Sequence, residues 1–351
     1  MRHKVRCAAI LLCLPLLPLT TCHLKVSPPA GRIVFQSAPM TVDPDIFIMR
    51  ENGFGKENLT KNISTVHRAP VLSPQGDKIL LISDLGGVTE QAYIMNLDGS
   101  DLRSVSAPGI GVNSARWSPD GERVVMDGNS SGAWDIYTCR ADGSGFARLF
   151  ETHVAQATDP VWSPNGDSIA FVTDASGNNR IAVTSAAGGS YTDILENLPQ
   201  VNANNNTAPR WSPTGRSIAF VSTEQPSQYS DIYVVGSNGS GLVNITQTTT
   251  VYEDAPRWSP DGKKIAFDSR LTSSGNNRIR IVAVDDGRTL DNGADYGGNE
   301  SSFAWSPDGK KIVYSTNRDN NFEIYIMDSD RNNPVRMTYS QAADLNPCWG
   351  R

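Results

Sequence analysis

Short apolar runs alternate with turn-forming residues along most of the chain. A typical stretch is ARWSPDGERVV at residues 115–125. Pro119 suits the second position of a tight turn, and Gly121 suits the left-handed conformation that closes it. The β-branched Val124 and Val125 then begin a new strand-like run. No segment shows a sustained helical period, so the pattern predicts an all-β chain built from hairpins.

The Trp-Ser-Pro-Asp-Gly stretch recurs at a regular interval. Its anchor positions are Leu72, Trp117, Trp162, Trp211, Trp258, Trp305 and Trp349, which lie 45, 45, 49, 47, 47 and 44 residues apart. An Asp-Ile-Tyr-like run, a Gly or Asn turn and a short final strand follow most anchors, which makes four strands per unit. A period in the mid-forties with four strands is typical of a β-propeller blade.

The two ends of the repeat region complete each other. Residues 32–60 supply outer strands without a preceding anchor, and residues 344–350 supply an anchor without following strands. Pairing these two fragments would close the ring and remove the open sheet edges. The sequence therefore predicts a single seven-bladed β-propeller over residues 32–351, closed by pairing its C-terminal strand with its N-terminal strands. The anchor tryptophans are expected to pack between adjacent blades.

The recurring Trp-Ser-Pro-Asp-Gly-Lys-Lys-Ile-Ala-Phe unit resembles the propeller repeats of the TolB-like family. Similar repeats occur in the propeller domains of prolyl-oligopeptidase-type enzymes and in oligogalacturonate lyase. TolB itself is the periplasmic protein of the Tol–Pal envelope system, with a separate α/β domain before six blades. The resemblance implies a propeller that binds proteins. The extra blade and the lack of room for an α/β domain predict a TolB-like protein rather than TolB.

The first residues predict export. Residues 1–21 combine a basic start with an apolar run that is too short to span a bilayer, as in a signal peptide. Leu19-Thr20-Thr21-Cys22 resembles a bacterial lipobox, which implies that Cys22 is acylated and followed by a linker over residues 22–31. The alternative is ordinary secretion with cleavage nearby. The expected location is the bacterial periplasm or outer membrane, with membrane contact only through the lipid.

Charge and cysteine content limit the partners. Residues 1–22 carry three basic residues and no acidic one, so their removal changes the net charge from −6 to −9. An acidic protein of this kind is a poor match to nucleic acid. Cys139 and Cys348 fall in units that are not neighbours in the ring, so no disulfide is expected. We expect a monomer.

A polar constellation precedes the anchors. Ring symmetry should place these residues around one mouth of the central channel, where grouped carboxylates would focus a negative potential. The prediction is a binding site for a basic or polar segment of an envelope protein or peptide, or for a cation. The alternative is that each side chain only caps backbone groups where its strand begins. The residues are His67, Asn113, Asp159, Asn206, Glu253, Asp254, Glu300 and Asp344.

Candidate catalytic groups are sparse. Gly128–Gly132 matches the G-x-S-x-G nucleophile pattern around Ser130, but that pattern needs a following helix that the sequence does not predict. No catalytic residue, metal site or cofactor is therefore predicted. The remaining ion candidate is a structural calcium at residues 328–332, which carry Asp328, Asp330 and Asn332. The predicted function is a non-enzymatic docking or scaffold propeller, and the alternative is a carbohydrate-active lyase or glycan-binding propeller.

Overall fold

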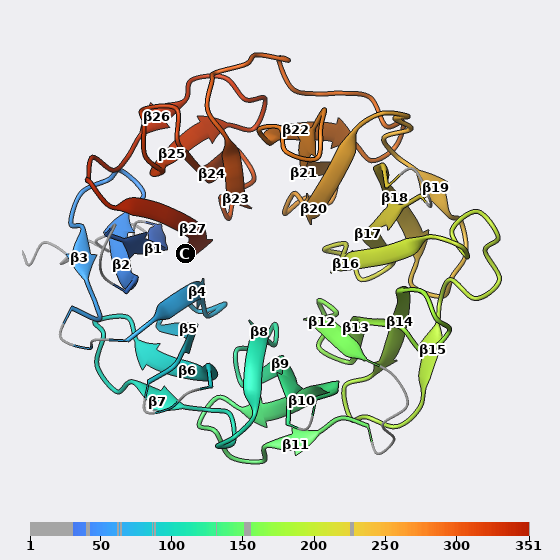
Figure 1. The fold of residues 1–351 in the computed structure, drawn as a ribbon, viewed down its shortest axis with the longest axis horizontal. Coiled ribbons are helices and arrows are strands. Elements are labelled where there is room, and N and C mark those ends of the chain that lie inside the picture. Colours follow the sequence, from blue (N-terminus) through green and yellow to red (C-terminus); the bar gives the residue numbers. More distant parts are fainter. Residues whose placement is uncertain are drawn as a thin grey trace, which may run out of the picture. The chain divides into compact units, whose positions relative to one another are not determined.

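The computed structural model describes residues 31–350, apart from residues 40–42, 62, 64, 86, 88, 131, 151–155 and 225–227. The predicted signal peptide, Cys22 and most of the linker lie outside this part. Within it the chain forms only strands, and they make seven sheets arranged as a ring around a centre (Figure 1). The described residues contain no helix that is long and apolar enough to cross a membrane.

Each sheet begins with an innermost strand that ends on or just beyond an anchor. The innermost strands are β4 (His67–Leu72), β8 (Gly111–Trp117), β12 (Ala157–Trp162), β16 (Asn205–Trp211), β20 (Tyr252–Trp258), β23 (Glu300–Trp305) and β27 (Ala343–Gly350). The second strands are β1 (Arg32–Ala38), β5 (Lys78–Ser83), β9 (Arg123–Asn129), β13 (Ser168–Thr173), β17 (Ser217–Thr223), β21 (Lys264–Arg270) and β24 (Lys311–Thr316). All innermost pairs are antiparallel.

The outer strands are shorter towards the rim of the ring. The third strands are β2 (Asp45–Arg50), β6 (Gln91–Asn96), β10 (Trp134–Arg140), β14 (Arg180–Ser185), β18 (Ser230–Gly236), β22 (Arg278–Ala283) and β25 (Glu323–Asp328). The fourth strands are β3 (Glu57–Asn58), β7 (Arg103–Ser104), β11 (Ala147–Arg148), β15 (Tyr191–Asp193), β19 (Val243–Asn244) and β26 (Val335–Arg336).

The ring closes as the sequence predicts. β27 pairs with β1 in antiparallel register, with Arg32 opposite Gly350 and Ile33 opposite Trp349. Both ends of the repeat region thus contribute to one sheet, of order β27-β1-β2-β3. The prediction of seven blades and of this closure is confirmed. Closure leaves no sheet edge open toward a missing blade.

The turns follow the predicted chemistry. Gly121 has a φ of 70°, in the left-handed region that glycine adopts without strain. The Ser118 hydroxyl accepts a hydrogen bond from the Arg123 amide at 2.8 Å and fixes the hairpin between β8 and β9. Ser73, Ser163, Ser212, Ser259 and Ser306 accept the matching bonds in other blades.

The core lies between blades. A typical cluster joins Leu80 and Ile82 of one blade with Val112 and Val124 of the next. The anchor Trp117 belongs to the same cluster, and its indole N–H donates to the Val71 carbonyl across the blade boundary at 3.1 Å. The prediction that anchors pack between blades is therefore confirmed.

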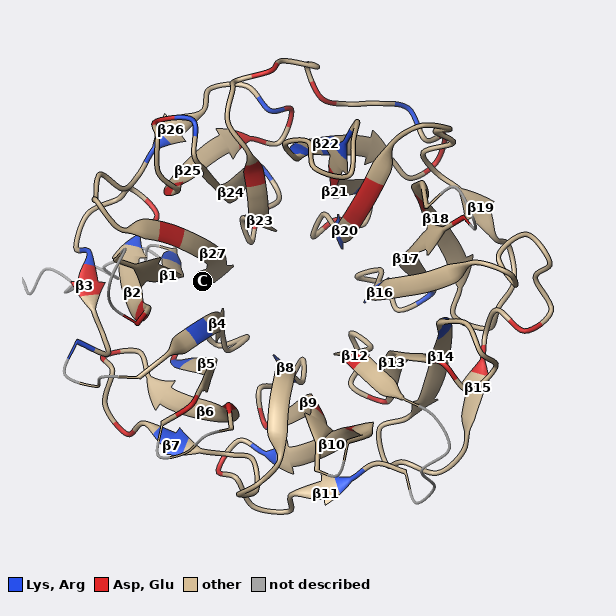
Figure 2. Ribbon diagram, viewed as in Figure 1, with Lys and Arg blue, Asp and Glu red and all other residues tan. Residues whose placement is uncertain are grey.

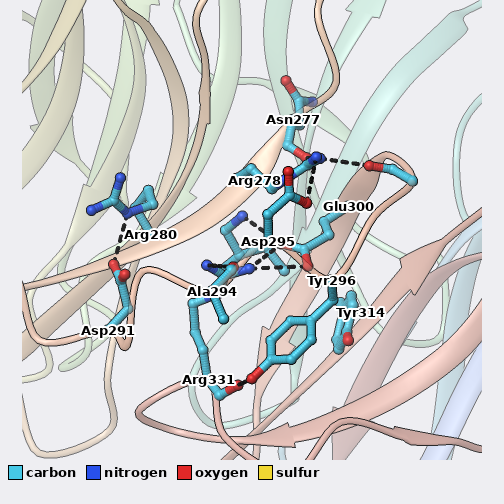
Figure 3. Close-up of polar contacts among 12 residues, drawn as sticks. Asn277, Arg278, Arg280, Asp291, Ala294, Asp295, Tyr296, Glu300, Tyr314 and Arg331 are labelled. Carbon is cyan, nitrogen blue, oxygen red and sulfur yellow. Dashed lines mark hydrogen bonds and ion pairs between the residues drawn. The ribbon is translucent and has the colours of Figure 1, made fainter. Parts of the chain in front are cut away.

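The blade of Trp258 departs from the four-strand pattern and has only three strands in the described structure. Residues 284–299, rich in Gly, Asp and Asn, make a single bridge between Val282 and Thr289 where a fourth strand would lie. Side chains hold this segment instead (Figure 3): Arg280 pairs with Asp291 at 2.8 Å. The Tyr296 hydroxyl donates to the Arg331 carbonyl, also at 2.8 Å.

Candidate functional site

A β-bulge shapes every innermost strand near its middle. The pairing register with the second strand shifts just before the anchor, for example between Asp254 and Arg257 in β20. The third residue before the anchor has a positive φ in six blades, at Ala69, Asp159, Ala208, Ala255, Ser302 and Asn346. The extra residue of the bulge shifts the alternation of buried and exposed positions by one along the strand. As a result, the fifth and second residues before the anchor are buried.

The predicted polar constellation divides into two groups. Five of its side chains are buried: His67, Asn206, Glu253, Glu300 and Asp344 are at most 3% exposed. All five stand five residues before their anchors, so they point into the blade wall. The acidic positions on β20, β23 and β27 can be followed in Figure 2.

The other three predicted residues stand closer to the anchor. Asn113 and Asp254 lie four residues before it and are exposed, and Asp159 lies three before it and is half-buried. Asn113 and Asp254 remain accessible at the end of the channel where the innermost strands begin, which we call the strand-entry end. Counting each residue's offset from its anchor would have separated the two groups in the sequence.

Glu300 is bound within the wall (Figure 3). Its carboxylate accepts two hydrogen bonds from the fully buried Arg331, at 3.0 and 2.8 Å, and one from the Ile279 amide at 3.0 Å. Arg318 adds a longer ion pair at 3.4 Å. This buried pair and the Ile279 amide bond link three segments of the chain, which is a structural role.

The remaining buried members differ in how well they are partnered. Asn206 donates to the Val201 carbonyl at 3.0 Å, and Asp344 pairs with Lys56 at 3.3 Å. Burial lowers the pKa of His67 below its ordinary value. Burial raises the pKa of Glu253 to about 7. The Asn206 bond matches the capping alternative, whereas Asp344 forms an ion pair and the buried His67 Nδ1 and Glu253 Oε2 atoms have no hydrogen-bond partner among the described residues.

The channel itself presents arginines that sequence reasoning missed. Arg116, Arg210 and Arg257 each stand immediately before an anchor tryptophan, and all three line a cavity of about 470 Å³. We call them the arginine trio. Tryptophans and the prolines of the Ser-Pro turns complete the cavity wall, so it lies toward the end where the innermost strands finish. The signal in the sequence was the Arg-Trp dipeptide, present in three of the seven units.

One carboxylate partly neutralises the trio. Asp159 lies 3.0 Å from Arg210 and 3.6 Å from Arg116. Burial alone would raise the pKa of Asp159, but the guanidinium groups of Arg210 and Arg116 hold it below the ordinary value. The buried Asp127 accepts a hydrogen bond from the Asp159 amide at 3.0 Å and so fixes this side chain's backbone.

The described residues show little that resembles a catalytic or metal centre. No group of three or more His, Cys, Asp or Glu among them is arranged to hold a metal ion. Ser130 follows β9 and precedes β10, so a strand stands where a nucleophile elbow needs a helix. In the calcium candidate, Asp328 accepts from Lys311 at 2.9 Å and Asp330 accepts from the Asn332 side chain at 2.8 Å. Cys139 and Cys348 are free thiols.

Comparison with known proteins places the fold. Residues 108–203 match the family model described as the TolB β-propeller domain. TolB from Acinetobacter baumannii is 17% identical with a TM-score of 0.56, over 91% of this chain and 82% of that one. Oligogalacturonate lyase from Vibrio parahaemolyticus is 13% identical with a TM-score of 0.61, over 88% and 86%. A puromycin-hydrolyzing peptidase from Mycobacterium tuberculosis is 14% identical with a TM-score of 0.65, over 84% and 50%.

A curated relative is the uncharacterized peptidase YuxL of Bacillus subtilis, which is 27% identical. That match spans 29% of this chain and only 21% of the relative, so it concerns a part of that protein. Likeness to the solved structures at these identities concerns the fold, which carries several different activities. The matched family model and the architecture agree with the repeat pattern, and the propeller of this chain is TolB-like.

Proposed function

We propose that this protein is an exported, envelope-tethered docking propeller that binds a segment of a partner protein at the strand-entry end of its channel. The observation that carries the proposal is the closed ring with a TolB-like repeat, in which polar side chains stay accessible on the innermost strands. Asn113 and Asp254 are exposed there, and the Asp254 carboxylate has no ion-pair partner among the described residues.

The chemistry of that end favours a basic or polar segment. Asp254 carries an exposed charge, and the mature chain is acidic overall. Exposed charge at a rim mainly speeds association and selects against the wrong partner. The lipid on Cys22 would keep the propeller at the membrane surface, where an envelope partner is met at high local concentration.

Site-specific photo-crosslinking in the native cell tests the docking site. A photoreactive side chain replaces Asn113 in one strain and Val243 in a control strain, because Val243 is half exposed on the outer strand β19. We expect one envelope protein to be captured from position 113 and not from position 243. Asp254→Lys should abolish that adduct. Equal capture from both positions, or no adduct at position 113, would refute docking at this end.

Fractionation tests the tether separately. Cys22→Ala should move the protein from the membrane fraction to the soluble periplasmic fraction and remove the acyl mass from its N-terminal peptide. A protein that fractionates identically with and without Cys22 is not lipid-anchored. The enzyme alternative has its own signature, since a carbohydrate-active propeller would cleave acidic polysaccharide in a reaction that does not depend on Asn113 or Asp254.

A further inference from the structure

The cavity near the Ser-Pro turns concentrates positive charge. Three guanidinium groups line a space of about 470 Å³, a size typical of pockets that hold small ligands. The indole N–H groups of Trp211, Trp258 and Trp305 already donate to backbone carbonyls of the preceding blade, at 3.2, 2.9 and 3.1 Å. The wall therefore offers apolar ring surface and leaves the arginines as its charged donors.

The three arginines of the trio differ in their charged partners among the described residues. Asp159 pairs with Arg210 and Arg116, at 3.0 and 3.6 Å. Arg257 makes no ion pair and no side-chain hydrogen bond among the described residues, and its nearest ring contact is Phe303, with the guanidinium carbon 5.6 Å from the ring centroid. Asp127 and Asp268 act on Arg116 and Arg257 from a greater distance, so Arg257 is the member of the trio that lacks a direct charged partner among the described residues.

The three guanidinium groups repel one another in this cavity. Arg257 is exposed to solvent, but its crowded position in the channel lowers its pKa to about 10, and the positive charges of Arg210 and Arg116 act in the same direction. The group still carries its proton at neutral pH. A negative ligand would remove the repulsion and supply acceptors for a donor that has none, and guanidinium groups suit carboxylate and phosphate through paired hydrogen bonds.

We propose that the cavity is a binding site for a small anion that carries carboxylate or phosphate groups, held by Arg257 together with Arg210 and Arg116. The site lies three residues further along the innermost strands than the exposed Asn113 and Asp254. It is therefore independent of partner docking at the strand-entry end, and either proposal can fail alone. Carboxylates and phosphates would both accept paired hydrogen bonds from the guanidinium groups, and binding measurements distinguish the two.

Calorimetric titration of the secreted chain with succinate and with inorganic phosphate tests the site. The control ligand 1,4-butanediol has the carbon chain of succinate without its charges and should not bind. We expect at least one anion to bind, more weakly at higher salt. Arg257→Gln should weaken that binding at least tenfold, and Asp159→Asn should strengthen it, because it frees two guanidinium groups.

A matched control is Arg103→Gln on the outer strand β7, where Arg103 pairs with Asp101 outside the cavity. This variant should bind like the wild type. Arg257→Gln leaves no buried group unpaired, so a thermal melt should show that it folds. The proposal is overturned if neither anion binds the wild type, or if Arg257→Gln and Arg103→Gln bind alike. Stronger binding of succinate than phosphate would assign the site to carboxylates, and the reverse order to phosphates.

Discussion

Two positions of the same strand serve opposite purposes in this propeller. The residue five places before the anchor is buried in the wall, where Glu300 pairs with Arg331 and Asp344 pairs with Lys56. The residue one place before the anchor faces the channel, where Arg210 and Arg257 line the cavity. Both positions are polar in several blades, so residue type alone does not separate them. The bulge between them decides which side chain holds the blades together and which meets a ligand.

The comparison shows that polar residues on the innermost strands do not all contribute to the surface of the channel, because some of them are buried between strands. Removing a buried carboxylate that has an ion-pair partner is expected to lower the stability of the fold. Removing a channel arginine that has no ion-pair partner is expected to lower ligand affinity instead. Substitutions at the two offsets can therefore test the comparison directly, with the free energy of unfolding as one measurement and ligand affinity as the other.

The largest expected effect is at Glu300. Glu300→Ala leaves the fully buried Arg331 without its carboxylate, and breaking a buried pair in this way costs about 3–5 kcal/mol. Urea unfolding of the secreted chain measures the change in the free energy of unfolding. The control is Asp254→Ala, an exposed position on the neighbouring blade, which should change it by less than about 0.5 kcal/mol. Equal losses in the two variants would contradict the division into wall and channel positions.

The second effect is a pH dependence at Glu253. Burial raises the pKa of Glu253 to about 7, the nearby Asp231 acts in the same direction, and Arg280 and a hydrogen bond from Thr246 oppose it. The folded state then holds a proton that the unfolded state loses near its ordinary pKa of 4.5. The stabilisation is present below pH 4.5 and is lost as the pH rises through 7.

Glu253→Gln should flatten this slope. Between pH 5 and pH 8 the wild type should lose about 2–3 kcal/mol through Glu253, a figure that follows from the size of the pKa shift. Asp268, whose pKa burial and Asp254 also raise to about 7, adds a second contribution of the same sign, so the variant keeps part of the slope. Unfolding curves at several pH values measure it. A stability that rises with pH in this window would show that Glu253 is charged in the folded protein.

A smaller effect on stability is expected from the hydrogen bond that an anchor indole N–H donates to a backbone carbonyl of the preceding blade. The Trp305 indole N–H donates to the Arg257 carbonyl at 3.1 Å, whereas the Trp349 indole N–H has no protein partner in the described structure. Trp305→Phe should cost about 1 kcal/mol more than Trp349→Phe, because only the first leaves a carbonyl unpaired. Both rings are similarly buried, so the lost apolar contact cancels. Thermal unfolding of the two variants compares them, and equal losses would mean that the inter-blade bond adds no stability.

The sequence predicted the fold well and the candidate site less well, for a physical reason. Repeat period, turn chemistry and complementary ends are local or additive features, so seven blades and the β27–β1 closure follow from them. Whether Glu300 is buried and Asn113 is exposed depends on a one-residue bulge, and neither of their two strands carries a Gly or Pro at that bulge to indicate where it lies. Glu300 begins β23 and Arg331 lies in the turn between β25 and β26 of the same blade, 31 residues later, and such a contact is not encoded by strand alternation.

The smallest effect on stability is expected at the channel position itself. Arg257→Gln should lower the free energy of unfolding by no more than about 0.5 kcal/mol, because its guanidinium has no ion-pair partner to lose and repels Arg210 and Arg116. Arg210→Gln should cost more, since it removes the 3.0 Å pair with Asp159. Chemical denaturation of both variants, without added anion, ranks them. If Arg257→Gln proves the more damaging of the two, then Arg257 is part of the structural wall, and the contrast between the two offsets of the innermost strand no longer holds in the blade of Trp258.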